Sequence, residues 1–256
     1  MSFLNLQMRT SLQNKDRSLL GSLARDIRRF GQKIRLTTNL VRRAGLIEGW
    51  KLARASKSQI GQDVFALSEL GAIRGGFFVE FGATNGVDRS NTWMVEKRLE
   101  WKGILAEPAR CWHVDLAKNR SCLIEHRCVW KATDEKLTFS EVTDPELSTL
   151  SSFSNDDFRG AARQSHQNYE VETISLNELL RTHGAPAVID FFSIDTEGSE
   201  FDILQAFDFT HRFRIIVCEH NYAPIREKIC ALLTSKGYVR RYADLSRFDD
   251  WYVWQG

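Results

Sequence analysis

The sequence predicts an α/β fold, and three observations carry the prediction. Strand-like and helix-like segments alternate from Ser58 onward, which is the pattern of a parallel sheet with crossover helices. The stretch 75–88 reads GGFFVEFGATNGVD, a short apolar run before a glycine-rich turn, as in a buried parallel strand that ends beside a ligand. Two short strands at 238–242 and 251–254 end the chain, and the polar turn between them suits a hairpin. Together they predict a mostly parallel seven-stranded sheet with an antiparallel C-terminal strand.

The first half of this sheet is expected between residues 62 and 129. A short helix leads into a strand of Phe and Val residues, and the next helix is closed by a Trp-Lys-Gly sequence. The second strand ends in Glu107-Pro108. The strands of this half are 76–81, 103–106 and 122–129, and the helices are 62–70, 91–99 and 111–119.

The second half follows a long polar segment, 131–168, which we expect to be irregular and to act as a lid, a binding loop or a hairpin insertion. Apolar runs then predict a short strand at 171–175 and the four remaining strands of the main sheet. These four strands are 188–194, 214–219, 238–242 and 251–254, and the helices between them are 176–181, 200–207 and 225–236.

The glycine-rich turn has the spacing Glu-x-Gly-x-x-x-Gly, formed by Glu80, Gly82 and Gly86. It is not the Gly-x-Gly-x-x-Gly turn that places a dinucleotide pyrophosphate at a helix N-terminus. An acid at the strand end suits a ligand that carries a positive charge or an amine, such as the methionyl end of S-adenosylmethionine. The alternative is an ordinary strand-to-helix turn.

Length and composition limit the class of protein. A chain of 256 residues suits one large α/β domain with appendages. It has no run of 18 or more apolar residues and no secretory signal pattern at its start. The five cysteines are scattered and form no Cys-x-x-Cys pair, which favours reduced thiols. We therefore expect a cytoplasmic protein, with peripheral membrane association left open by its basic N-terminus.

The first 57 residues form a basic extension. They hold thirteen Lys/Arg residues against three acids, while the whole chain has a net charge of +2. Leu19, Leu20, Leu23, Ile27 and Phe30 recur at helical spacing among arginines. Such a helix can lie on an anionic membrane, contact nucleic acid, or pack on the domain or a second subunit. Nucleic acid is the least favoured of these partners.

Three longer stretches resemble one family. They are similar to an FkbM-type methyltransferase domain. In chain order they read GGFFVEFGATNGVDRSNTWMVEKRLEWKGILAEPA, then VETISLNELL with VIDFFSIDTEGSEFDIL, and finally IIVCEHNYAPIREKICALLTSKGY. The resemblance begins near Gln59, reaches the C-terminus, and implies a Rossmann-like class I methyltransferase fold over 58–256, with 1–57 as a helical N-terminal extension. The turn 81–86 departs from the family, which more often ends in Asn-Asp-Gly, but Thr84 and Asn85 keep it polar.

The resemblance implies S-adenosylmethionine as the cofactor, which needs a cradle for its amino acid, an acid for its ribose and an apolar slot for adenine. Glu107 ends the strand after the glycine-rich loop and is the expected ribose ligand. Trp130 is a candidate for stacking on adenine, although it is equally suited to a core. The expected cofactor-binding residues are Glu80, Gly82, Ala83, Asn85, Gly86, Glu107, Trp130 and Asp195.

The expected catalytic residues come from the ends of two strands. Asp195 and Glu197 follow 188–194, while Glu219 and His220 end 214–219. His220 or Asp195 is a candidate general base; alternatively Asp195, Glu219 and His220 bind Mg²⁺. Asp195 and Glu197 should point into the cofactor cleft, because strand ends at the carboxyl edge face it. The alternative is that Glu197 merely belongs to the start of a helix, where acids are favoured.

The expected activity is O-methylation of a hydroxyl on a sugar, glycan or related natural product. The Asn/Asp-Pro-Pro-aromatic turn of nucleic-acid amino-methyltransferases is absent after strand 188–194, which favours oxygen as the acceptor. The alternatives are an RNA or protein methyltransferase that docks through its basic arm, and a non-catalytic adaptor with the same fold.

Overall fold

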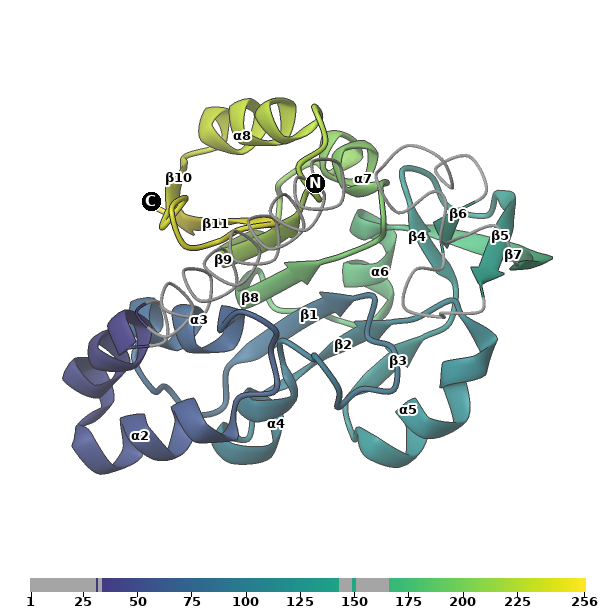
Figure 1. Ribbon diagram of the computed structural model, residues 1–256. Coiled ribbons are helices and arrows are strands. Elements are labelled where there is room, and N and C mark those ends of the chain that lie inside the picture. Colours follow the sequence, from purple (N-terminus) through teal and green to yellow (C-terminus); the bar gives the residue numbers. More distant parts are fainter. Residues whose placement is uncertain (1–30, 32–33, 143–148, 151–165) are drawn as a thin grey trace, which may run out of the picture.

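A seven-stranded sheet forms the centre of the molecule (Figure 1). The computed structural model describes residues 31, 34–142, 149–150 and 166–256. The strand order is β10-β11-β9-β8-β1-β2-β3. Only β11 runs against its neighbours β9 and β10 among these strands, so the predicted mostly parallel sheet with an antiparallel last strand is confirmed. The bounds are β1 Phe77–Phe81, β2 Lys102–Ala106, β3 Leu123–Glu125, β8 Val188–Ile194, β9 Arg212–Glu219, β10 Tyr238–Arg241 and β11 Asp249–Trp254.

Helices cover both faces of this sheet, because successive side chains of a buried strand point to opposite sides. Phe78 packs with helices α3, α4 and α5, whereas Val79 packs with α6, α7 and α8. All of these helices lie within two residues of the predicted ranges. Their bounds are α3 Gln62–Leu70, α4 Trp93–Leu99, α5 His113–Asn119, α6 Leu176–Thr182, α7 Glu200–Ala206 and α8 Arg226–Ser235.

The predicted third strand, 122–129, is wrong as a single element. The structure divides it into β3 and β4 (Cys128–Trp130), which belong to different sheets. The carboxylate of Glu125 accepts a hydrogen bond from the Arg127 backbone N–H at 3.0 Å and another from its guanidinium at 2.9 Å. This local pairing turns the chain, so β4 leaves the main sheet.

In its described part, the polar segment after β4 is a hairpin insertion, which is one of the three predicted alternatives. Strand β5 (Lys136–Val142) pairs antiparallel with β7 (His166–Ser175), and β6 (Thr149–Leu150) pairs with β5. Strand β7 also pairs with β4, which gives a four-stranded sheet of order β4-β7-β5-β6. The predicted strand 171–175 is therefore only the end of a ten-residue strand.

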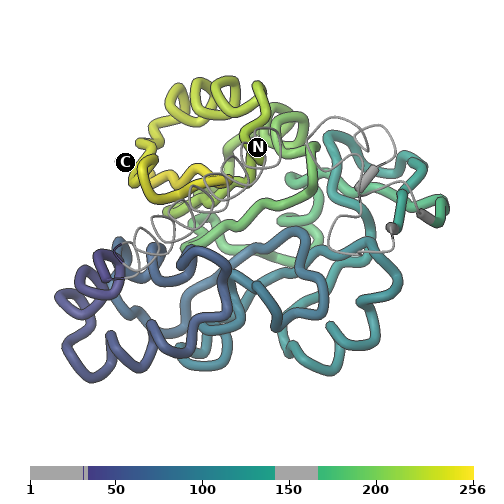
Figure 2. Tube along the Cα trace, in the orientation of Figure 1, coloured from purple at the N-terminus to yellow at the C-terminus, as the bar shows by residue number. Residues whose placement is uncertain are grey.

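Two helical segments precede α3 at one end of the main sheet. Residues 34–44 are helical, and α2 spans Leu46–Ala55. Leu36, Leu40 and Leu52 are buried in the cluster that holds Phe65 and Phe78, so this part of the basic extension packs on the α/β core. Figure 2 shows it far from the insertion of β4 to β7. The predicted helix around 19–30 lies outside the described residues, and the division at residue 57 stays a prediction.

In the part of the chain that the structure covers, no helix is long and apolar enough to cross a membrane.

The position of β1 creates the place for a ligand. The chain runs outward from β1 to β2 and β3, then returns to build β8 and β9 on the other side of β1. In open α/β sheets, ligands bind outside the carboxyl ends of the strands where the strand order reverses. The reversal lies between β1 and β8.

Candidate active site

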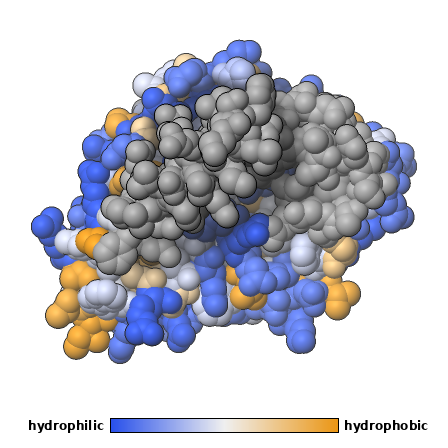
Figure 3. Space-filling view, in the orientation of Figure 1, coloured by the Kyte–Doolittle hydropathy of each residue, from blue (hydrophilic) through white to orange (hydrophobic). Residues whose placement is uncertain are grey.

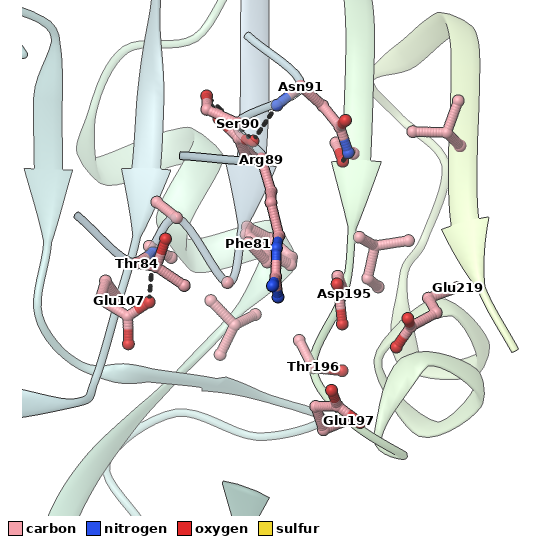
Figure 4. A pocket seen from close by; sticks show the side chains of 18 of the residues that line it. Phe81, Thr84, Arg89, Ser90, Asn91, Glu107, Asp195, Thr196, Glu197 and Glu219 are labelled. Atoms are coloured by element: carbon pink, nitrogen blue, oxygen red, sulfur yellow. Dashed lines mark hydrogen bonds between the residues drawn. The ribbon is translucent and has the colours of Figure 1, made fainter. Parts of the chain in front are cut away.

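A pocket opens at the reversal point, and the ends of β1, β2, β8 and β9 line it (Figure 4). Its charge is strongly one-sided: among the described residues that line it, Arg89 is the one cation. The seven acids are Glu80, Asp88, Glu107, Asp195, Glu197, Glu219 and Asp249. An acidic pocket favours a cationic ligand.

The turn after β1 approaches the end of β8 closely. Gly82 has φ +74°, and a Cβ there would lie 2.2 Å from the backbone oxygen of Asp195. Its N–H donates to the Ala106 carbonyl at 3.1 Å. Only glycine permits both this backbone angle and this contact, so Gly82 draws the ends of β1, β2 and β8 together. Gly82 and the buried Ala83 line the pocket as predicted.

Asn85 and Gly86 shape the same turn from outside, since neither is among the pocket-lining residues. The Asn85 side-chain oxygen accepts from the backbone N–H groups of Val87 and Asp88, both at 2.9 Å. Gly86 has φ +78° and packs against the Arg120 side chain. These two residues therefore stabilise the loop, and their contact with the cofactor stays a prediction.

Glu80 lines the pocket but is largely engaged with the chain that follows it. It is buried and accepts hydrogen bonds from Ser90, from the Asn91 backbone and from Thr92. These bonds hold residues 90–92 outside the helix, so the helix predicted from residue 91 begins two residues later. Asn91 reaches the pocket and donates to Ser193 on β8 at 2.9 Å.

Glu107 lies on the β2 side of the pocket, where the sequence placed it. Its two carboxylate oxygens accept from the backbone N–H groups of Thr84 at 2.7 Å and Ala109 at 2.9 Å (Figure 4). Burial raises the pKa of Glu107 to about 7, although these bonds oppose the shift. Each oxygen keeps a further acceptor position, which suits a pair of ligand hydroxyls.

The structure does not bring Trp130 to the pocket. Its ring is 8% exposed and packs with Ala109, Phe139 and Val171, and Trp130 is not one of the residues that line the cavity. Val129 and Phe139 line the wall at this point instead. Apolar side chains therefore line the pocket beside the predicted position, while an adenine slot there and stacking on Trp130 stay predictions.

A group of three acids occupies the opposite side of the pocket, at the ends of β8 and β9. Carboxylate oxygens of Asp195, Glu197 and Glu219 all lie within 4.8 Å of one another. Asn221 donates to Glu219 at 2.6 Å and to Glu197 at 3.3 Å. Within the described residues this is the one group of three or more His, Cys, Asp or Glu that could share a metal ion. The group therefore contains Glu197 in place of His220, which was the third member of the predicted set of metal ligands.

His220 points away from this acidic group. Its Nδ1 accepts from the Tyr222 backbone N–H at 3.0 Å, and its Nε2 lies 3.8 Å from an Asp250 carboxylate oxygen. The ring is buried outside the residues that line the pocket, and burial lowers the pKa of His220 below its usual range. A general base must reach the proton that it removes, and this placement argues against His220 in that role.

Sequence reasoning missed Asp249 and Gln62, which complete the pocket beside the acidic group. Gln62 donates to Asp249 at 2.9 Å, and burial raises the pKa of Asp249 to about 7. Asp249 begins β11 and pairs with Glu219 at the end of β9. The predicted C-terminal hairpin could have revealed Asp249. An antiparallel last strand begins at the sheet edge where the parallel strands end, so its first residues lie beside the pocket.

Arg89 was also missed. It has φ +59°, and its guanidinium extends from the loop into the space between Glu107 and Asp195 (Figure 4). An arginine that lines an acidic pocket is suited to a ligand carboxylate.

The family model described as Methyltransferase FkbM domain matches residues 80–242, more than half of the 256 residues. A search of curated proteins finds no match.

Two solved structures of low similarity were also found. One is a precorrin-6y C5,15-methyltransferase from Geobacter metallireducens GS-15, with TM-score 0.40, 13% identity, and coverage of 76% of this chain and 87% of that chain. The other is a methyltransferase FkbM from Methylobacillus flagellatus KT, with TM-score 0.46, 12% identity, and coverage of 86% of this chain and 58% of that chain.

Proposed function

Because this chain belongs to the FkbM methyltransferase domain family, we propose that it transfers a methyl group from S-adenosylmethionine to a hydroxyl oxygen of a sugar, glycan or related natural product. The observation that carries the proposal is the division of the pocket into two acidic sides. Glu107 lies on the β2 side, and Asp195, Glu197 and Glu219 lie on the β8–β9 side (Figure 4).

The β2 side has the chemistry for the cofactor. Glu107 would accept the two ribose hydroxyls in its ionised form, with its orientation fixed by the Thr84 and Ala109 backbone. Val129 and Phe139 offer the apolar wall for adenine, and Arg89 offers a cation for the methionyl carboxylate. When bound, the cofactor would supply an electrophilic methyl group on a sulfonium, whose S–CH₃ bond breaks to leave a neutral thioether.

The β8–β9 side has the chemistry for the acceptor. Asp195 would accept the proton of the acceptor hydroxyl while that oxygen takes the methyl group. Glu219 and Glu197, both buried and held by Asn221, would orient the hydroxyl. Three carboxylates so close repel one another, so an arriving proton or cation is stabilised there.

The same three acids have the oxygen ligands that a hard cation prefers. Mg²⁺ bound there would lower the pKa of the acceptor hydroxyl directly, and Asp195, Glu197 and Glu219 would hold it. This is the alternative route for the same reaction.

Calorimetric titration with S-adenosylmethionine, followed by turnover on a panel of glycans and hydroxylated natural products, tests the proposal. We expect binding, and methyl transfer to at least one hydroxyl acceptor. Activity that survives EDTA supports Asp195 as the group that accepts the hydroxyl proton. Activity that is lost with EDTA and restored by Mg²⁺ supports the metal route. Binding without transfer to any hydroxyl, together with transfer to RNA or protein, would replace the acceptor class.

A further inference from the structure

A second surface lies outside the residues that line the pocket, on α2. Leu46, Ile47 and Trp50 are 65%, 71% and 54% exposed, although all three are large and apolar. They share one side of the helix, and Gly49 and Leu52 on the other side are buried. Figure 3 shows hydrophobic surface beside hydrophilic surface at this end of the molecule. We define Leu46, Ile47 and Trp50 as the α2 patch.

The patch is held rigidly at the tip of a helical hairpin. Residues 34–44 are helical, Gly45 turns the chain with φ +84°, and α2 follows at once. The two helices are in close contact, since a Cβ on Gly49 would lie 2.7 Å from the Val41 Cα. Leu46 and Ile47 directly after this turn therefore project from a packed support.

Basic residues surround the patch. Arg42 and Arg43 are exposed just before the turn, and Lys51 and Arg54 continue the exposed side of α2. None of these four makes an ion pair with another described residue. Glu48, half-buried, is the one acid between residues 34 and 57. The tip thus combines exposed apolar area with uncompensated positive charge.

The other large exposed hydrophobic residues do not gather in this way. The others lie on six different segments of the chain, and single exposed hydrophobics are ordinary. They are Ile34, Val114, Leu123, Val188, Tyr222 and Val239. Three on one short helix are a patch that marks an interaction.

We propose that the α2 patch docks the protein on an anionic lipid bilayer. Trp, Leu and Ile enter the boundary between headgroups and acyl chains, and Arg and Lys beside them attract anionic headgroups. Charge complementarity selects this partner over a second copy of the chain, whose identical basic tip would repel it. In Figure 1, α2 lies at one end of the molecule, on the side away from the insertion of β4 to β7.

Vesicle co-sedimentation of the full chain tests this surface. The vesicles are phosphatidylcholine alone, and phosphatidylcholine with 30% phosphatidylglycerol, each at low and at 0.5 M salt. We expect binding to the anionic vesicles that falls with salt. The double variant Ile47→Ser/Trp50→Ser should bind at least tenfold more weakly, and Arg42→Gln/Arg43→Gln about 25-fold more weakly, at about fivefold per charge.

Matched controls separate the patch from a general surface effect. Val114→Ser/Val188→Ser removes two exposed apolar residues elsewhere, and Lys118→Gln/Lys236→Gln removes two exposed cations; both should bind as the parent does. Circular dichroism checks that every variant is folded. If Ile47→Ser/Trp50→Ser binds vesicles as strongly as the parent, the proposal is wrong. It is also wrong if the parent binds no vesicles but forms a dimer that this variant does not form.

Discussion

Buried carboxylates occur in two neighbouring regions of this protein, and they are neutralised in opposite ways. Behind the glycine-rich loop, Glu80 and Glu96 face Arg120, whose side chain is fully buried; its Nε donates to Glu96 at 2.6 Å. In the pocket, Glu107 and Asp249 are held by backbone and amide N–H groups. The first region contains its own cation within hydrogen-bonding distance, whereas these bonds to Glu107 and Asp249 come from neutral donors, although Arg89 also lines the pocket.

The pKa values record the difference. Burial raises the pKa of Glu96, but the charge of Arg120 and the hydrogen bonds outweigh it and lower that pKa to about 2. Burial raises the pKa of both Glu107 and Asp249 to about 7, and the charge of Asp195 adds to each shift. A buried acid without a cation is unfavourable for stability. Its presence in the pocket indicates that this region is shaped for a ligand, while the Arg120 region is shaped for the fold.

The largest effect expected from this contrast is on turnover. Asp195→Asn keeps the shape of the side chain but removes the proton acceptor, so turnover should fall by roughly 10²–10⁴. Single-turnover kinetics with saturating cofactor measure this loss, and the exposed Asp115→Asn is the control. Full activity in Asp195→Asn would remove Asp195 from the reaction.

His220→Gln sharpens the same experiment. Because His220 is buried outside the pocket, its replacement should lower the free energy of unfolding. The turnover of the folded variant should change little. A loss of turnover equal to that of Asp195→Asn, in a folded protein, would contradict the placement of the base on the β8 side.

The next largest effect is on stability. Arg120→Leu leaves Glu80 buried without its cation and Glu96 with only Lys97 as a cationic partner, which should cost about 3–5 kcal/mol of unfolding free energy. Urea unfolding measures it, with Arg74→Leu as the control, because Arg74 and Glu100 form an exposed pair worth about 0–1 kcal/mol. Equal losses in both variants would show that the Arg120 region does not depend on its ion pairs.

The two regions also differ in how far the sequence predicted them. Glu107 and Asp195 were found because strand ends and a glycine-rich turn are visible in a linear pattern, and that pattern also predicted the main sheet. Arg120 was not singled out, because its partners Glu80 and Glu96 are 40 and 24 positions away and only the packing of α5 against the loop brings them together. Long-range side-chain pairing leaves no periodic signal.

The points where the structure departs from the sequence prediction have the same origin. His220 and Glu197 both follow strands that end at the pocket, but their orientation depends on local backbone: Glu197 has φ +55°, and the His220 ring is fixed by the Tyr222 N–H. The divided strand 122–129 depended on a side-chain contact between Glu125 and Arg127. Patterns locate strand ends; they do not give the direction of each side chain.

A smaller effect is expected on cofactor affinity. Glu107→Ala removes the acceptor for two ribose hydroxyls, so S-adenosylmethionine should bind at least tenfold more weakly, which corresponds to about 1.4 kcal/mol or more. Calorimetry measures the dissociation constant, and Glu100→Ala serves as the control because Glu100 is an exposed acid on another surface. Equal affinities for the two variants would exclude Glu107 from the site.

The smallest effect expected is a dependence of stability on pH without ligand. The folded pKa of Glu107, about 7, lies above its usual 4.5, so between these values the folded state binds more protons than the unfolded state. The stability that this carboxyl contributes is therefore present below pH 4.5 and lost as the pH rises through 7. Glu96 acts in the other direction, since its contribution is lost only as the pH falls from 4.5 through about 2.

Urea unfolding of the ligand-free protein between pH 5 and pH 8 separates these contributions. Glu107→Gln cannot ionise, so its unfolding free energy should decline less over this range, by an amount on the order of 1 kcal/mol. Glu100→Gln should keep the parental slope. The cofactor should reverse the trend in the parent, because its hydroxyl groups favour the ionised carboxylate and its binding strengthens as the pH rises through 7. Parallel pH curves for Glu107→Gln and the parent would mean that the Glu107 carboxyl is already ionised in the folded state, and the contrast between the two regions would then rest on geometry alone.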